Sequence, residues 1–131
     1  MPWDATRLVV EEAGARTIVA GGDQRESICQ PTWGPDGALW FCGDRTGFWS
    51  LYRWTREGGR SAVVDIAMDI GFPQWVFALR CFAFLDDGRV AFVHGGDGTD
   101  HLAIHDPRTG TTNRVSVPHT SIDALHVRST A

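Results

Sequence analysis

The amino-acid sequence predicts an all-β fold built from repeated four-stranded units, and three observations predict it. Short apolar runs alternate with turns rich in glycine and proline, of which the chain has 15 and 6, a pattern typical of strands. No segment keeps the i, i+3, i+4 apolar spacing of a helix, since Gly71 and Pro73 interrupt residues 66–80, the segment that comes nearest to it. The third observation is an internal repeat.

The repeat becomes visible when the sequence is shifted by 51 positions, which aligns PDGALWF (35–41) with DDGRVAF (86–92). Each copy has four apolar runs separated by turns that contain Asp or Gly, as in an antiparallel meander. Pro-x-Trp recurs at a spacing of 42, at 31–33 and 73–75, so the second copy carries an insertion of about nine residues. A four-stranded unit of about 40–50 residues predicts the blade of a β-propeller.

We expect a partial β-propeller over residues 1–131, with its elements in the following order. Residues 7–20 form a hairpin that corresponds to half a blade. The first full blade and the second, which carries the insertion, span residues 28–65 and 73–117. Residues 121–127 form the lone first strand of a next blade. The strands are placed near 28–33, 38–43, 48–54 and 60–65 in the first blade, and near 80–85, 89–94, 100–105 and 112–117 in the second.

A propeller ring closes with four or more blades, so these elements cannot close a ring by themselves. The hairpin and the last strand are expected to leave unpaired strand edges and exposed blade faces. Because such edges and faces recruit partners, we expect the chain to self-associate.

Composition narrows the class of protein. The formal net charge of −4 argues against a nucleic-acid or anionic-membrane binder. No apolar run approaches the roughly 18 residues of a membrane span, and the N-terminal MPWDATRLVV lacks the pattern of a secretory signal. Cys29, Cys42 and Cys81 have no C-x-x-C spacing, which predicts reduced, mostly buried thiols in a cytoplasmic protein.

The run ESICQPTWGPDGALWFCGDRTGFWSLYRW (26–54) closely resembles the propeller of the prolyl oligopeptidase family of serine peptidases, in particular its bacterial acylaminoacyl-peptidase and dipeptidyl-aminopeptidase members. A blade of that group commonly reads QPxWSPDGxLxFxSDRTGWWNLYR. Here Gly34 and Gly43 replace serines, Phe48 replaces Trp and Ser50 replaces Asn. FPQWVFALRCFAFLDDGRVAF (72–92) and DHLAIHDPRTG (100–110) resemble the following blade. GPDGALWF alone also resembles a blade of the virginiamycin B lyase type, but the continuation DRTGFWSLYRW fits that family poorly.

This resemblance implies a non-catalytic propeller fragment that gates and positions peptide substrates for an α/β-hydrolase domain. In the family the catalytic Ser, Asp and His lie in that domain, so this chain is expected to be inactive by itself while its parent protein is a serine peptidase. The expected partners are the hydrolase domain, a peptide substrate and further copies of the chain. Two alternatives stay open, namely a stand-alone module that binds a protein or peptide, and a lyase or sugar-binding propeller.

Four residues of the first blade are the candidate substrate or rim contacts: Asp44, Arg45, Phe48 and Trp49. For Asp44 and Arg45 the alternative is a turn in which the carboxylate caps backbone amides and the guanidinium pairs locally. The large aromatic side chains are expected to fill the space between blades, with Phe48 or Trp49 as the exposed exception. The tryptophans meant are Trp33, Trp40, Trp49, Trp54 and Trp75.

No catalytic, cofactor-binding or metal-ligating residue is predicted. No serine lies in a G-x-S-x-G turn. His101 and His105 would lie about 13 Å apart along a strand, too far to share an ion. The loop HGGDGTD (94–100) is interpreted as a turn between strands, because its counterpart in the first copy is DRTG. A zinc site built from the three cysteines is not expected either.

Overall fold

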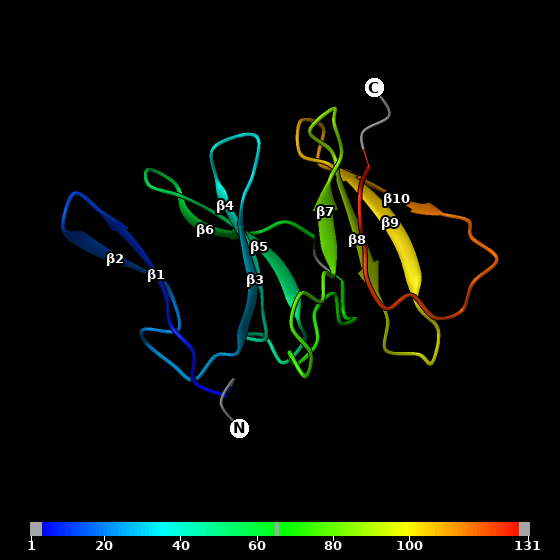
Figure 1. Cartoon of the computed structure of the whole chain (residues 1–131), viewed down its shortest axis with the longest axis horizontal. Coiled ribbons are helices and arrows are strands. Elements are labelled where there is room, and N and C mark those ends of the chain that lie inside the picture. Colours follow the sequence, from blue (N-terminus) through cyan, green and yellow to red (C-terminus); the bar gives the residue numbers. More distant parts are fainter. Residues whose placement is uncertain (1–3, 65, 129–131) are drawn as a thin grey trace.

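The computed structural model describes residues 4–64 and 66–128, which form three antiparallel sheets (Figure 1). A two-stranded sheet, β1-β2, precedes two four-stranded sheets with the orders β3-β4-β5-β6 and β7-β8-β9-β10. Each four-stranded sheet is a meander, in which every strand pairs with its neighbour in sequence. This confirms the predicted all-β, partial propeller with a hairpin before two blades.

The strand bounds follow the turns that the sequence contains. They are β1 Leu8–Glu12, β2 Ala15–Ala20, β3 Ile28–Trp33, β4 Leu39–Gly43, β5 Ser50–Thr55, β6 Gly59–Ala62, β7 Phe82–Phe84, β8 Val90–His94, β9 His101–Asp106 and β10 Thr111–Val115. The equivalent turns of the two blades contain Gly37, Gly47, Gly88 and Gly98. Each of these glycines has a positive φ, a backbone conformation that is strained for a residue with a side chain. Among the described residues, no helix has the length and hydropathy needed to cross a bilayer.

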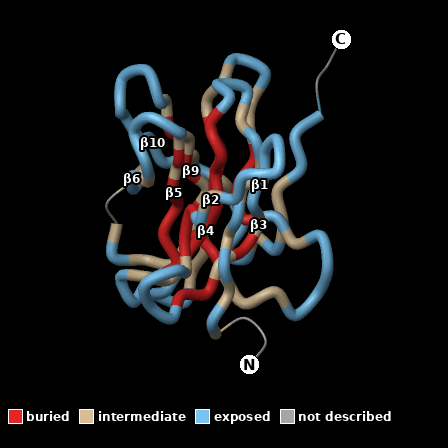
Figure 2. Tube along the Cα trace, turned by 90° about the vertical axis from the view of Figure 1, so that its left-hand side faces the viewer, coloured by how far each residue is buried: buried red, intermediate tan, exposed pale blue. Residues whose placement is uncertain are grey.

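Strand β4 shows how the blades pack, since all five of its residues are buried (Figure 2). Successive side chains of a strand point to opposite faces. Leu39 and Phe41 therefore join the apolar cluster shared with the hairpin, while Trp40 and Cys42 join the cluster shared with the second blade. The first blade is covered on both faces, which explains its unbroken apolar run ALWFC.

Two tryptophans differ from the expectation that all five fill the space between blades. Trp40, Trp49 and Trp54 are buried, but Trp33 is 58% and Trp75 is 69% exposed. Trp33 is the last residue of β3, at the end of the sheet. Trp75 lies in the insertion between the blades. The expectation was wrong for these two because it rested on residue type alone, without the position in the blade.

Residues 121–127 follow the second blade as extended chain and are not assigned to a strand in the described residues. Two backbone N–H groups of this segment have partners: the N–H of Leu125 donates to the carbonyl of Arg80 at 3.0 Å, and that of Ile122 donates to Asp100 Oδ2 at 2.9 Å. The predicted lone strand is thus present as a segment lying against the second blade, without a ladder of hydrogen bonds.

Candidate functional site

The candidate site is a pocket of about 580 Å³ between the two blades, which we call the inter-blade pocket. It lies where the linker after β6 meets the turns that lead into β5 and β9. Its walls include the apolar side chains of Trp49, Phe72 and Leu79, and its rim carries three carboxylates, those of Asp69, Asp100 and Asp123. A pocket with apolar walls and a few convergent polar groups is the usual form of a small-ligand site.

Asp69 ties the linker to both blades at this pocket. Its Oδ1 accepts a hydrogen bond from the N–H of Trp49 at 2.7 Å, and its backbone exchanges two hydrogen bonds of 2.9 Å with Gly95. The N–H of Ile70 then donates to the carbonyl of Trp49 at 2.6 Å. Gly71 lets the linker approach this closely, because a Cβ there would meet Trp49 Cε3 at 2.9 Å.

The carboxylates keep acceptor capacity toward the pocket. Asp100 accepts from the N–H of Ile122 through Oδ2, as Asp69 accepts from Trp49 through Oδ1. Since an ionised carboxylate has two oxygens and about four acceptor positions, each group can accept further bonds. The chemistry of this pocket is therefore that of an apolar cavity with negative charge at its rim, which suits a ligand with an apolar body and a cationic amine.

Asp44 and Arg45, two of the predicted rim contacts, are held by local partners. Asp44 Oδ1 accepts from the N–H of Ser27 at 2.7 Å. Arg45 forms a bidentate pair with Asp23, at 2.9 and 2.7 Å, which raises the pKa of Arg45 and lowers that of Asp23. These contacts match the alternative of a capped turn, and a role in substrate contact stays a prediction.

Phe48 and Trp49 have opposite environments. Phe48 is 42% exposed, whereas Trp49 is 9% exposed and packs in the apolar cluster between the blades. Trp49 nevertheless lines the inter-blade pocket. Of the four predicted contacts, Trp49 is thus the one that the structure brings to this pocket. It meets there Asp69, which the sequence did not single out, and Asp100, which the sequence placed in the HGGDGTD turn.

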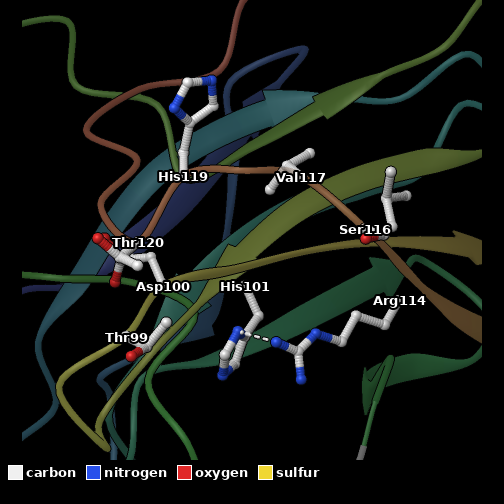
Figure 3. A pocket seen from close by; sticks show the side chains of 9 residues that line it. Thr99, Asp100, His101, Arg114, Ser116, Val117, His119 and Thr120 are labelled. Atoms are coloured by element: carbon white, nitrogen blue, oxygen red, sulfur yellow. Dashed lines mark hydrogen bonds between the residues drawn. The ribbon is translucent and has the colours of Figure 1, made fainter.

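A second pocket, of about 440 Å³, lies between β9, β10 and residues 116–120 (Figure 3). Arg114 donates to His101 Nδ1 at 2.6 Å. Because arginine only donates, the neutral imidazole carries its proton on Nε2, which faces Asp97 Oδ2 at 3.5 Å. Ser116 and His119 come from the segment across the pocket (Figure 3). We do not assign this pocket a chemical role.

Gln30 is a contact that sequence reasoning missed, although it is the first residue of the QPxW part of the resemblance. Its side chain crosses from β3 to the start of the second blade. Oε1 accepts from the N–H of Cys81 at 2.7 Å, and Nε2 donates to the carbonyl of Phe82 at 2.7 Å. Gln30 itself has a φ of 50°, at an irregularity in the pairing of β3 with β4. The side chain takes the place of a neighbouring strand for the first residues of β7.

Comparison with solved structures gives matches that cover nearly all of the chain. Puromycin hydrolase is 34% identical with a TM-score of 0.81, and the match covers 98% of this chain and 20% of that one. A puromycin-hydrolyzing peptidase of Mycobacterium tuberculosis is 31% identical with a TM-score of 0.74, covering 90% of this chain and 19% of that one. TolB from Acinetobacter baumannii, at 18% identity and a TM-score of 0.66 over 93% of this chain, shares the fold alone.

No protein-family model and no curated protein matches the chain. The chain spans about a fifth of the length of the two peptidases that it matches above 30% identity. A peptidase propeller is indicated by three observations together: the two consecutive four-stranded meanders, the repeated motifs and these two matches. Over nearly its whole length, the chain is similar to a part of these peptidases, as is consistent with the β-propeller portion of a prolyl oligopeptidase family peptidase.

Proposed function

We propose that this chain is a non-catalytic propeller portion that gates and positions peptide substrates for an α/β-hydrolase domain outside these 131 residues. The observation that carries the proposal is the match to puromycin hydrolase, which has 34% identity over 98% of this chain but covers only 20% of that enzyme. The chain thus corresponds to a part of a peptidase, and the inter-blade pocket is the place on it that suits a substrate.

The inter-blade pocket supports binding of the amino end of a peptide. A free α-amino group is cationic at neutral pH, and Asp69 and Asp100 place carboxylates at the rim. Trp49 and Phe72 offer an apolar wall for the first side chain of the peptide. The pocket should therefore bind a peptide with a blocked amine more weakly than one with a free amine, because the blocked amine offers the carboxylates no cationic partner.

Ligand binding tests this positioning role directly. We would titrate the purified chain with puromycin, since two matched structures are named for its hydrolysis, and with a dipeptide amide in free and N-acetylated forms. We expect the free amine to bind more tightly. We expect Asp69→Asn and Asp100→Asn to reduce binding about 10- to 150-fold each, since a charge-assisted hydrogen bond contributes about 1.5–3 kcal/mol.

Two controls make this test decisive. The asparagine side chain introduced in each variant can still accept the N–H group of Trp49 or of Ile122, so circular dichroism should show intact strands. Asp87→Asn, in the exposed turn of the second blade where Asp87 pairs with Arg89 at 2.8 Å, should leave binding unchanged. Equal affinity for free and acetylated peptides, or equal losses in all three variants, would contradict the positioning role.

The gating role depends on a neighbouring hydrolase domain. Sequencing the source DNA on both sides of this reading frame tests whether the frame continues into a G-x-S-x-G segment with downstream Asp and His. We also expect the purified chain not to hydrolyse chromogenic aminoacyl or peptidyl substrates. Activity that copurifies with the chain through repeated purification would contradict the non-catalytic role. A frame that stops with no hydrolase nearby would favour a stand-alone binding module instead.

A further inference from the structure

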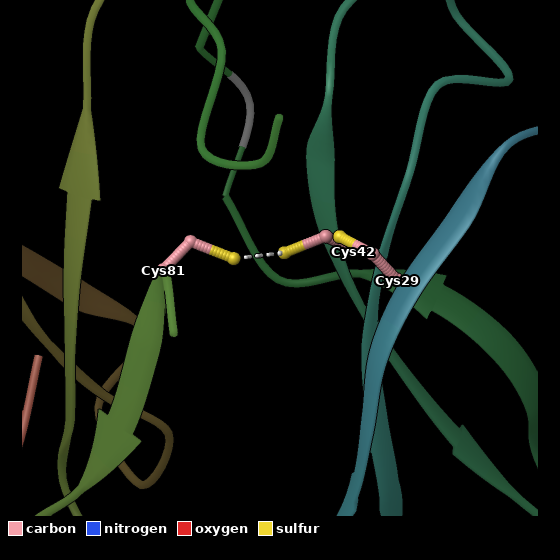
Figure 4. A group of neighbouring side chains, drawn as sticks. All are labelled: Cys29, Cys42 and Cys81. Carbon is pink, nitrogen blue, oxygen red and sulfur yellow. Dashed lines mark hydrogen bonds between the residues drawn. The ribbon is translucent and has the colours of Figure 1, made fainter. Parts of the chain in front are cut away.

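The three cysteines of the chain meet in the apolar core between the blades, although they are far apart in sequence (Figure 4). Cys29 comes from β3, Cys42 from β4, and Cys81 from the residue before β7. Their Sγ atoms all lie within 4.8 Å of one another, and those of Cys42 and Cys81 are 3.5 Å apart. The three residues are 3%, 0% and 1% exposed.

These distances fit thiolates on one metal ion better than a disulfide. With metal–sulfur bonds of about 2.3 Å, two thiolates on a tetrahedral or trigonal ion lie about 3.8–4.0 Å apart. The Sγ atoms, 3.5 Å apart for Cys42 and Cys81 and within 4.8 Å for all pairs, therefore need to shift by about 1 Å or less to share an ion. A disulfide needs about 2.05 Å between sulfurs, so Cys42 and Cys81 would have to move about 1.5 Å closer across the contact between two blades.

The first blade holds Cys81 in position. Gln30 Oε1 accepts a hydrogen bond from the backbone N–H of Cys81 at 2.7 Å and another from its thiol at 3.2 Å. Metal binding would release the second of these bonds, because a ligating thiol loses its proton. The ligand from the second blade is thus fixed by a side chain of the first blade.

The donor set indicates which ion would bind. In the described residues the cluster consists of sulfur donors alone, without a histidine or carboxylate, and its neighbours in the core, such as Leu51, Phe82 and Ile70, are apolar. Soft thiolate ligands select copper(I), zinc and iron–sulfur clusters. Structural zinc takes four ligands, whereas three sulfurs suffice for copper(I).

We propose that Cys29, Cys42 and Cys81 form a binding site for one copper(I) ion between the two blades. Each thiol that becomes a ligand releases its proton to the solvent, as metal binding to cysteine requires. Because one ligand comes from the second blade and two from the first, the site is complete only when the blades are docked. Bound copper(I) then stabilises the docked blades, since a ligand that binds the native state alone raises its stability. The proposal does not depend on the proposed function.

Anaerobic titration of the reduced chain tests this site. Copper(I) is supplied as its coloured bicinchoninate complex, whose loss of absorbance reports transfer to the protein. We expect transfer of one ion per chain, a rise in the thermal unfolding midpoint, and a copper K-edge absorption spectrum with three sulfur neighbours. A parallel titration with zinc should show weaker binding and a smaller rise in the midpoint.

Variants separate the site from the fold. Cys42→Ser and Cys81→Ser should each abolish the copper-dependent rise in the unfolding midpoint. Val90→Ala removes apolar volume from the same cluster and keeps all three thiols, so it should lower the midpoint and retain the copper-dependent rise. No transfer from bicinchoninate, tighter binding of zinc than of copper(I), or a copper-dependent rise that persists in both serine variants would overturn the proposal.

Discussion

The buried pair of Glu26 and Arg60 gives the sharpest prediction of stability. The Glu26 side chain is 0% and the Arg60 side chain 17% exposed, and Arg60 Nη1 donates to both carboxylate oxygens at 2.9 and 3.0 Å. Glu26 Oε2 also accepts from the N–H of Gly21, directly after the hairpin strand β2. The pair therefore joins the hairpin to β6, the outer strand of the first blade.

The perturbation is Arg60→Met, which keeps an unbranched apolar stem and removes the charge. Loss of one partner leaves a carboxylate buried without its counter-charge, which costs about 3–5 kcal/mol. The cation–π contact of Arg60 with the Tyr52 ring, 5.2 Å from Cζ to the ring centroid, contributes part of that loss. With a urea m-value of about 2 kcal/mol/M, a loss of about 4 kcal/mol lowers the unfolding midpoint by about 2 M.

Arg53→Met is the matched control. Arg53 pairs with Asp36 at 2.7 Å, but both side chains are about a third exposed, at 35% and 33%. A pair with this much solvent contributes about 1 kcal/mol or less. Urea unfolding followed by tryptophan fluorescence and by circular dichroism gives both free energies and checks for coincident transitions.

A double variant completes the test. Glu26→Gln in the Arg60→Met background removes the buried charge and keeps an acceptor for the N–H of Gly21, so it should restore at least half of the lost stability. If Arg60→Met costs under about 1 kcal/mol, or no more than Arg53→Met does, the pair is effectively solvated and the reasoning from burial is refuted.

The packing of the blades supports three further predictions. Gln30→Ala should lower the free energy of unfolding by about 1–3 kcal/mol, because it leaves buried backbone groups of the second blade unsatisfied; urea unfolding should show no comparable loss for the exposed Gln24→Ala. Burial lowers the pKa of His94 and of His105 below the usual 6.5, so the unfolded chain takes up protons first and stability should fall as the pH drops below about 6.5. The unfolding midpoint should depend less on pH in the double variant His94→Gln/His105→Gln than in the parent chain. The same pH dependence in both proteins would contradict the role of these two histidines. Ile18 is 54% exposed on the hairpin, on a face that suits another blade. Sedimentation should therefore show self-association of the chain, and Ile18→Lys should weaken it. A chain that stays monomeric at all concentrations would contradict the expectation that open strand edges recruit partners.

Local turn chemistry made the strand order predictable from the sequence. The turns at Gly37 and Gly88 each adopt a positive φ that glycine alone takes at little cost, and each stands beside an aspartate that accepts from a nearby backbone N–H. The information that places such a turn lies within a few residues, so the repeat was enough to locate both blades. The blades in turn carried the resemblance to a peptidase propeller.

The candidate site was less predictable, because its residues come from different blades. Asp69 and Asp100 are 31 positions apart in sequence and meet only when the linker packs against both blades. Asp69 belongs to no quoted motif, and Asp100 lies in the HGGDGTD loop, which the sequence showed only as a turn. Trp49 was foreseen as a contact because it lies in the DRTGFW segment, yet its place in the pocket wall depends on the linker.

The sequence by itself determined the all-β meander and the two blades, since both depend on local turns and on a repeat within one chain. The motifs of those blades also carried the resemblance to a peptidase propeller. Only the tertiary structure decided that Trp33 and Trp75 are exposed and that Cys29, Cys42 and Cys81 converge. Cys42 and Cys81 are 39 positions apart, and nothing in their spacing fixes the rotation of one blade against the next. That rotation is set by how large side chains such as Trp40 and Phe82 fill the space between blades, a property of the whole interface.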